Sequence, residues 1–430
     1  MVLDTSRSRR RAFLKTVGTA SIVGLAGCSG DGGDGGSDGG DGGSDGGDGG
    51  GGTTSGGSGG DVVIGDAAPL SGNFSPWGTS HRRGLQFAVD EVNNDGGVLG
   101  ARNLKLVAQD TEANPQNATT VFRRLVNNQD AVAVTGSVLS DVAIGVQSVA
   151  EELEVPHLPD QGGSPQVYTE GTKYAFQVAG LSSPAWPLTT SGFIEEQGYS
   201  KYGAIFADYS YGRLYEEGIN RYIKPIEGLQ TTVKPAPVGA QDFSSQLRQL
   251  PSDIDFLDIG GHPVGIFTIA QQALELGIEA QAASGPVIPT PLFYETLGED
   301  VENWLTLFSP VKLNSDEYNQ LGSRFYDQTE GFFDMFAGFG YVTGKLLAAA
   351  IEEAGEADPT AIRDALSGIS FDSPILGYTI SYTDWGELEQ SKLYGYQFTL
   401  DAPADYPEGN YGFKNVYESQ TIDPLLPDYW

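Results

Sequence analysis

The chain has 430 residues and carries 57 acidic side chains against 24 basic ones, a net charge of −33. Its hydrophobic content of 39% is enough for one large or two mid-sized cores and excludes a wholly disordered chain. A surface this acidic repels nucleic acid and anionic membrane faces, so neither is expected as a partner. Many acids and few lysines are typical of adaptation to molar salt, where charges are screened within about 3 Å. An ordinary acidic protein with an acidic linker is the alternative.

Cysteine and histidine are scarce, which limits the chemistry of the chain. One cysteine excludes a disulfide within the chain, and His81, His157 and His262 lack the spacing of a metal motif. We therefore expect no metal and no cofactor.

The first 60 residues have the pattern of an export signal followed by a tether. The stretch "RRRAFLK" (9–15) resembles a twin-arginine signal, and the apolar stretch 16–27 is shorter than the ~20 residues that span a bilayer. "LAGC" resembles a lipobox, so we expect a signal peptide over 1–28 and a lipid anchor at Cys28. A signal peptide followed by a chance cysteine is the alternative. Residues 29–60 contain no apolar side chain and are predicted to be a disordered Gly/Asp tether.

From residue 61 onward, short apolar runs alternate with helical patterns. Strands are predicted at 61–70, 104–110, 131–137, 155–160, 202–208, 231–238 and 255–261. Helices are predicted at 78–93, from Pro115, from Ser140, from Tyr211, at 242–250 and at 263–276. Asn114 is expected to be an N-cap with proline behind it. Strands separated by helices indicate parallel sheets covered on both faces, and the chain is too long for one sheet. The pattern therefore predicts an α/β protein with two lobes.

The residues that end these strands indicate binding rather than catalysis. In open α/β sheets, ligands bind beyond the carboxyl ends of the strands. The strand ends here hold serines, aromatics and glycines, without a nucleophile elbow, a Ser–His pair or a metal-ligand set. A recognition cleft is predicted and no enzyme. A secreted hydrolase, with clustered acids such as Asp110 and Glu112 as its functional groups, is the less favoured hypothesis.

One family combines these features. The first block "APLSGNFSPWGTSHRRGLQFAVDEVNNDGGVLG" is followed in order by "VTGSVLSDVA", "VPHLPDQGGSP", "FADYSYGRLYEEG", "FLDIGGHPVGIFTIAQQALELGI" and "SGPVIP". Together they resemble the solute-binding proteins of branched-chain amino acid ABC importers, over nearly all of 61–400. The resemblance implies the type I periplasmic-binding fold, in which two doubly wound Rossmann-like lobes are joined by a three-strand hinge.

The resemblance also implies a set of ligand contacts. Trp77 matches an aromatic that covers the ligand side chain, and Tyr211 matches a tyrosine that closes over the ligand from the second lobe. Ser140 matches a serine that holds a carboxylate, in keeping with its place at a helix N-terminus, although a plain N-cap serine would look the same. The remaining implied contacts are Gln161, Gly162, Gly163, Ser164 and His262.

One position departs from the family pattern. Amino-acid binders of the family have a glutamate after Gly-Pro that pairs with the ligand ammonium, and here that position is Val287. A buried ammonium without an anion costs several kcal/mol. Either another acid substitutes, with Asp141, Asp160 and Asp208 as candidates, or the ligand lacks an ammonium.

The resemblance further implies how the chain is divided and what it does. Lobe 1 is expected over 61–180 and 309–393, and lobe 2 over 181–308 and 394–430, with crossovers near 180–184, 307–310 and 393–395. The implied partners are a small polar or carboxylate-bearing solute, most simply an amino acid, and the permease of an ABC importer. A monomer is expected, anchored on the outer face of the cell membrane. A binder of amides or aromatic carboxylates and a ligand-sensing receptor subunit are the alternatives.

Overall fold

The computed structural model contains two separate β-sheets, each built from strands that alternate with helices. It describes residues 60–178, 183–237, 239–260, 263–278, 280–285, 290–302, 304–401 and 412–429. The predicted signal peptide, Cys28 and nearly all of the predicted tether lie outside the described residues. We use lobe 1 for the part that carries the first sheet and lobe 2 for the part that carries the second. The predicted lobe boundaries themselves stay a prediction.

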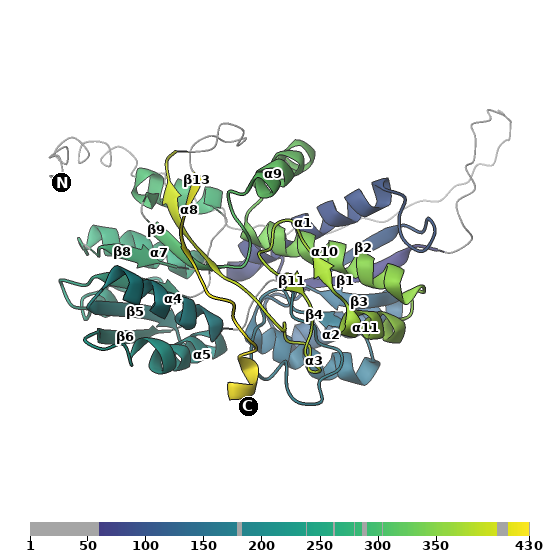
Figure 1. Cartoon of the computed structure of the whole chain (residues 1–430), viewed down its shortest axis with the longest axis horizontal. Helices are drawn as coiled ribbons and strands as arrows, with labels where there is room; N and C mark the ends of the chain where they lie inside the picture. Colours follow the sequence, from purple (N-terminus) through teal and green to yellow (C-terminus); the bar gives the residue numbers. More distant parts are fainter. Residues whose placement is uncertain are drawn as a thin grey trace, which may run out of the picture. The chain divides into compact units, whose positions relative to one another are not determined.

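The first sheet has the strand order β2-β1-β3-β4, and its strand pairs are all parallel (Figure 1). Its strands are β1 (Val62–Ala68), β2 (Leu104–Asp110), β3 (Ala131–Thr135) and β4 (His157–Leu158). The helices between them are α1 (Ser75–Asn94), α2 (Pro115–Gln129) and α3 (Ser140–Leu153). Further along the chain come α9 (Asp316–Thr329), α10 (Met335–Ala354), α11 (Pro359–Gly368) and the short antiparallel pair β10 (Phe371–Asp372) and β11 (Thr379–Ile380). The alternation predicted for this part of the chain is confirmed.

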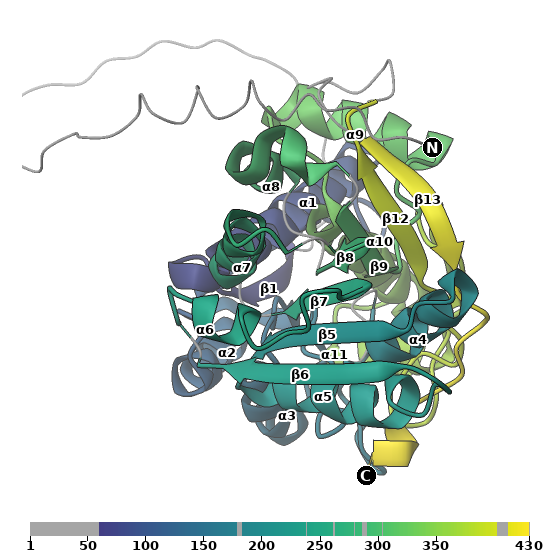
Figure 2. The same ribbon diagram turned by 90° about the vertical axis from the view of Figure 1, so that its left-hand side faces the viewer.

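The second sheet has the strand order β13-β12-β9-β8-β7-β5-β6. Its strands are β5 (Lys201–Ala207), β6 (Gln230–Ala236), β7 (Phe256–Gly260), β8 (Ala282–Ser284), β9 (Trp304–Ser309), β12 (Tyr394–Thr399) and β13 (Gly412–Glu418). Its helices are α4 (Ala185–Gln197), α5 (Ser210–Gly218), α6 (Ser244–Leu247), α7 (Pro263–Glu275) and α8 (Thr290–Leu297). Strands β5 to β9 pair in parallel, whereas β12 pairs with β9 and β13 in antiparallel fashion (Figure 2).

Local sequence explains several element boundaries. The Asn114 side chain accepts a hydrogen bond of 2.9 Å from the Asn117 N–H, so it caps α2 as predicted. Pro235 lies in β6, which is an edge strand, and a residue without an N–H is tolerated there. The helix predicted over 242–250 is wrong in length, because the chain tightens after Leu247. The Leu250 N–H donates to the Leu247 carbonyl instead of continuing the α-helical ladder.

Helices α1 and α10 lie side by side, and glycines let them approach closely (Figure 1). A Cβ atom on Gly84 would lie 1.8 Å from the Ala337 carbonyl oxygen, and one on Gly340 would lie 2.0 Å from the His81 carbonyl oxygen. Both positions therefore require glycine. This close packing places Trp77, in the first turn of α1, against Phe336, in the first turn of α10, with ring centroids 5.4 Å apart.

Candidate binding site

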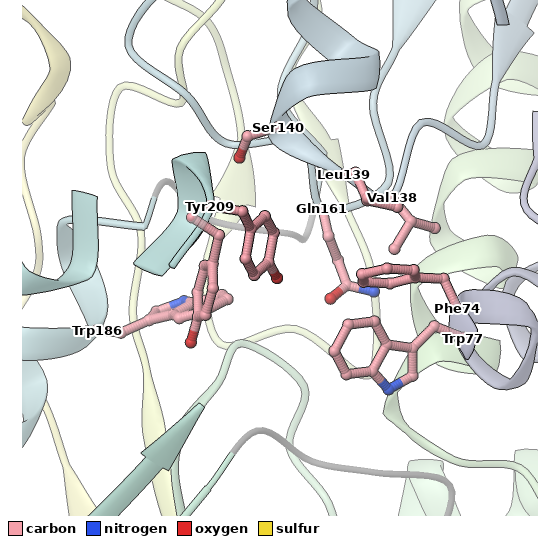
Figure 3. A pocket seen from close by; sticks show the side chains of 9 residues that line it. Phe74, Trp77, Val138, Leu139, Ser140, Gln161, Trp186 and Tyr209 are labelled. Atoms are coloured by element: carbon pink, nitrogen blue, oxygen red, sulfur yellow. The ribbon is translucent and has the colours of Figure 1, made fainter. Parts of the chain in front are cut away.

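A pocket lined by residues of both lobes lies beyond the carboxyl ends of β1, β3 and β5. Its lining residues are Phe74, Trp77, Val138, Leu139, Ser140 and Gln161 from lobe 1 and Trp186, Tyr209 and Tyr211 from lobe 2 (Figure 3). The cavity volume is about 20 Å³. That is close to the room one water needs, so a solute enters only if the lobes or the side chains move apart.

Five aromatic rings form a continuous row across the pocket, which we call the aromatic belt: Trp77, Phe74, Tyr209, Tyr211 and Trp186. Successive ring centroids are 5.9, 6.3, 5.5 and 5.2 Å apart. Each end is supported from behind, since Trp77 packs on Phe336 and Trp186 stacks on Phe308 at 4.8 Å. The contact between Phe74 and Tyr209 joins the two lobes. These distances are typical of stabilising aromatic pairs.

Ser140 lies at the N-terminus of α3, in the lining of the pocket. It is the first residue of α3, and Leu139 is the N-cap, which makes no side-chain capping bond. The serine is 3% exposed and lines the pocket (Figure 3). Since Leu139 is the N-cap residue of α3, Ser140 is not the N-cap serine of the alternative interpretation. A buried hydroxyl beside the free N–H groups of a helix N-terminus forms a ready site for an anionic oxygen.

The segment predicted to contact the ligand through main-chain groups reaches the pocket only at Gln161. The N–H groups of Gln161 and Gly162 donate to the Ser137 carbonyl at 3.3 and 3.1 Å, and the Gly163 N–H donates to the Gln161 carbonyl. Gly162 and Gly163 are not among the lining residues. Ser164 is buried, and its hydroxyl accepts a bond of 3.3 Å from the Gln166 N–H. These main-chain donors are already used inside lobe 1.

The three acids considered as substitutes for the missing glutamate all have other partners. The Asp141 carboxylate accepts a hydrogen bond from the Ser210 hydroxyl of lobe 2. Asp160 pairs with His81, with Nδ1 and Oδ1 3.0 Å apart, and Asp208 pairs with Arg213 at 3.0 Å on the surface. None of the three lines the pocket.

A buried cluster of Asp66, His81 and Asp160 lies within lobe 1, directly before the lining residue Gln161. All three side chains are at most 1% exposed. Burial raises the pKa of Asp66 to about 6. Burial alone would lower the pKa of His81, but the charge and hydrogen bond of Asp160 and the charge of Asp66 raise it above its ordinary value. The cluster holds β1, α1 and the loop after β4 together, which is a structural role.

The other histidine in the described part of the chain is also structural. The ring nitrogens of His157 lie 3.1 Å from Gln147 Oε1 and 2.9 Å from Ser137 Oγ, and the residue is fully buried. Burial lowers its pKa to about 3, so the ring is neutral. Cys28, His262 and Val287 lie outside the described residues.

Four predicted residues meet in this pocket: Trp77, Ser140, Gln161 and Tyr211. Sequence reasoning missed the lining residues Phe74, Val138, Leu139, Trp186 and Tyr209. Phe74 and Tyr209 were within reach of prediction, because each lies two or three positions before a predicted contact on the same strand-to-helix connection. Nothing in the local pattern around Trp186 separates a pocket residue from an ordinary core residue.

No described helix is long and apolar enough to cross a membrane. No group of three or more histidine, cysteine, aspartate or glutamate side chains in the described ranges is arranged to hold a metal ion.

Two wound α/β sheets with a pocket between their lobes define a class of proteins that bind small solutes. The sequence profile of one such family, described as periplasmic binding protein, matches residues 61–401. The chain therefore belongs to the periplasmic binding protein family, and the predicted resemblance is confirmed at that level.

Among curated relatives, the leucine-, isoleucine-, valine-, threonine- and alanine-binding protein of Pseudomonas aeruginosa is 26% identical over 348 residues. The match covers 79% of this chain and 91% of that protein. These curated relatives of the chain are named as binding proteins, in agreement with the prediction that this chain is not an enzyme.

Solved structures show the same fold. The branched-chain amino acid substrate-binding protein LivJ of Streptococcus pneumoniae, in complex with isoleucine, has a TM-score of 0.71 at 19% identity and covers 85% of this chain and 100% of its own. A solute-binding protein of R. palustris, in complex with benzoate, has a TM-score of 0.71 at 18% identity and covers 85% and 98%. The predicted type I periplasmic-binding fold is confirmed.

Proposed function

We propose that this chain is the solute-binding component of an ABC importer and that it binds a small carboxylate-bearing solute between its two lobes. The observation that carries the proposal is Ser140, a buried serine at the N-terminus of α3 that lines a pocket formed by both lobes. Helix N–H groups together with a hydroxyl favour a carboxylate over a neutral group. The Pseudomonas aeruginosa relative, named for binding five amino acids, supports the assignment.

The proposed mechanism is closure of the two lobes around the solute by a hinge at the three expected crossovers. The Asp141–Ser210 hydrogen bond and the Phe74–Tyr209 contact each join the lobes. They stabilise the closed form, and closure removes water from the pocket, which strengthens the polar contacts to the solute. The closed form then docks on the permease and delivers the solute.

Membership in a family of periplasmic binding proteins indicates an extracytoplasmic location. We further propose that the chain works as a monomer, exported by the twin-arginine route and held on the outer face of the membrane by a lipid at Cys28. The stretch 29–60 would be its tether, which keeps the binding protein near its permease. The acidic composition supports function at molar salt.

A second candidate ligand class is the aromatic carboxylates. Five of the nine described lining residues are aromatic, and no acid lines the pocket among the described residues. The benzoate complex of the R. palustris protein supports this class. A panel of leucine, isoleucine, benzoate and their amides, measured by calorimetry at molar salt, separates the classes.

Replacing Ser140 with alanine is expected to weaken binding of a carboxylate ligand about tenfold or more, because a hydrogen bond to a charged group contributes roughly 1.5–3 kcal/mol. Calorimetry at molar salt measures the effect with whichever carboxylate of the panel binds. Ser148→Ala on the exposed face of the same helix is the matched control and should leave affinity unchanged. Equal affinity of Ser140→Ala and the parent chain would remove the assignment of Ser140.

A further inference from the structure

The aromatic belt lies beside the carboxylate position proposed at Ser140. The polar side-chain atoms around both are mainly ones that can donate hydrogen bonds. Among the described lining residues, the Trp77 indole Nε1 and the Tyr211 hydroxyl are buried without a hydrogen-bond partner, and the Ser140 hydroxyl lines the same pocket. An indole nitrogen only donates. Burial strongly raises the pKa of Tyr211, so its hydroxyl keeps its proton and can donate as well. The pocket is thus rich in donors.

The described lining residues offer no anionic acceptor to the N–H groups of a ligand. A primary ammonium brings three N–H donors, and each must find an acceptor when it is buried. Among the described lining residues, Gln161 is the only carboxamide and there is no carboxylate. Its Nε2 already donates to Asp160 at 3.4 Å, so the acceptors that remain on the described lining side chains are its carboxamide oxygen and hydroxyl oxygens, all of them neutral. A primary ammonium is therefore poorly matched.

A carboxylate ligand that has no positive charge of its own also fits this pocket poorly. No lysine or arginine is among the described residues that line the pocket, and the Asp141 carboxylate follows Ser140 directly in the first turn of α3. A carboxylate at Ser140 would thus be held by dipoles and hydroxyls next to a like charge. A ligand without net charge, whose carboxylate is balanced by its own cation, avoids this repulsion.

The aromatic belt offers a place for such a cation. The negative faces of tryptophan and tyrosine rings attract cations, and cages of such rings bind alkylated ammonium groups, which have no N–H to satisfy. The belt holds two tryptophans and two tyrosines. Trp77 lies on the lobe 1 side, and Trp186 and Tyr209 lie on the lobe 2 side (Figure 3).

We infer that the ligand is a small zwitterion whose carboxylate binds at Ser140 and whose fully N-alkylated ammonium lies within the aromatic belt. The inference rests on the proposed function, because it keeps the carboxylate position and the closure of the lobes. It adds the identity of the ligand's cationic group. This group is an ammonium without N–H groups, in place of the primary ammonium of an ordinary amino acid.

Calorimetry of the full chain at molar salt tests this with three compact carboxylates: N,N,N-trimethylglycine, glycine and 3,3-dimethylbutanoate. The last has the shape of trimethylglycine with carbon in place of the charged nitrogen. Trimethylglycine is expected to bind at least about tenfold more tightly than either, because a desolvated cation–aromatic contact contributes on that scale. Equal binding of 3,3-dimethylbutanoate would overturn the inference, since the belt would then act only as an apolar wall.

A variant pair locates the effect. Tyr209→Leu keeps an apolar side chain but removes a ring from the belt, and it should weaken trimethylglycine binding at least about fivefold while 3,3-dimethylbutanoate changes little. Tyr326→Leu replaces a similarly half-buried tyrosine on α9, outside the pocket, and should bind trimethylglycine as the parent chain does. Equal effects of Tyr209→Leu on both ligands would contradict the cation site.

The two proposals fail in different ways. If leucine or benzoate binds in a manner that depends on Ser140 and trimethylglycine does not, the proposed function stands and the zwitterion inference falls. If no carboxylate binds at any concentration tested, both fall.

Discussion

Replacing His81 with leucine is expected to lower the free energy of unfolding by about 3–5 kcal/mol, because it leaves Asp160 buried without its partner. The two side chains are 0% exposed and lie 3.0 Å apart. Asp66 in the same cluster adds a second carboxyl that the histidine no longer faces. Denaturant unfolding at molar salt, followed by circular dichroism, measures the loss.

Two further variants separate the buried pair from side-chain size and from surface charge. The double variant His81→Leu with Asp160→Leu removes both charges and should recover most of the loss, since an apolar pair of similar volume often replaces a buried ion pair without cost. Arg213→Leu breaks the exposed pair with Asp208, in which both side chains are more than half exposed, and should cost less than about 1 kcal/mol. A His81→Leu variant no less stable than Arg213→Leu would refute the structural role of the cluster.

Replacing Gly84 with alanine is expected to cost about 3 kcal/mol, because the added methyl group would meet the Ala337 carbonyl oxygen at 1.8 Å. Backbone atoms of α10 cannot turn aside as a side chain can, so the two helices must separate. The same unfolding measurement reports the cost.

Gly145 provides the matched control, because it too lies inside a helix of lobe 1. A Cβ atom there meets nothing nearer than Pro115 Cβ at 3.6 Å. Gly145→Ala should therefore stabilise the chain by about 0.5–1 kcal/mol, the ordinary gain in helix propensity. If both variants shift stability in the same direction, the close approach of α1 and α10 is not what requires glycine at position 84.

Much of the fold follows from local pattern. The strand predicted at 104–110 has the same bounds in β2, and the Asn114–Pro115 pair begins α2 as expected. These elements were predictable because apolar periodicity and capping act over a few residues. The early start of α1 at Ser75 and the short α6 were not, since packing and hydrogen bonding beyond the local window set them.

The site was predictable only in part, for a physical reason. Ser140 and Trp77 stand at junctions of strand and helix, where the topology of an α/β sheet concentrates binding residues. The five-ring belt depends on side chains at or just before the starts of α1, α4 and α5 that meet only in the folded chain. Likewise, the partners of Asp141, Asp160 and Asp208 became visible only when residues far apart in the sequence came together.

The central claim is that a solute binds between the lobes and is enclosed by the belt, and tryptophan fluorescence tests it most directly. Trp77 and Trp186 line the pocket, whereas Trp304 and Trp385 do not. Titration of the full chain with the panel carboxylates and trimethylglycine at molar salt should give a saturable change in tryptophan emission with at least one of them. That change should disappear in the variant that combines Trp77→Phe and Trp186→Phe. A saturable change that persists undiminished in this variant, or no change with any solute, would contradict binding at this pocket.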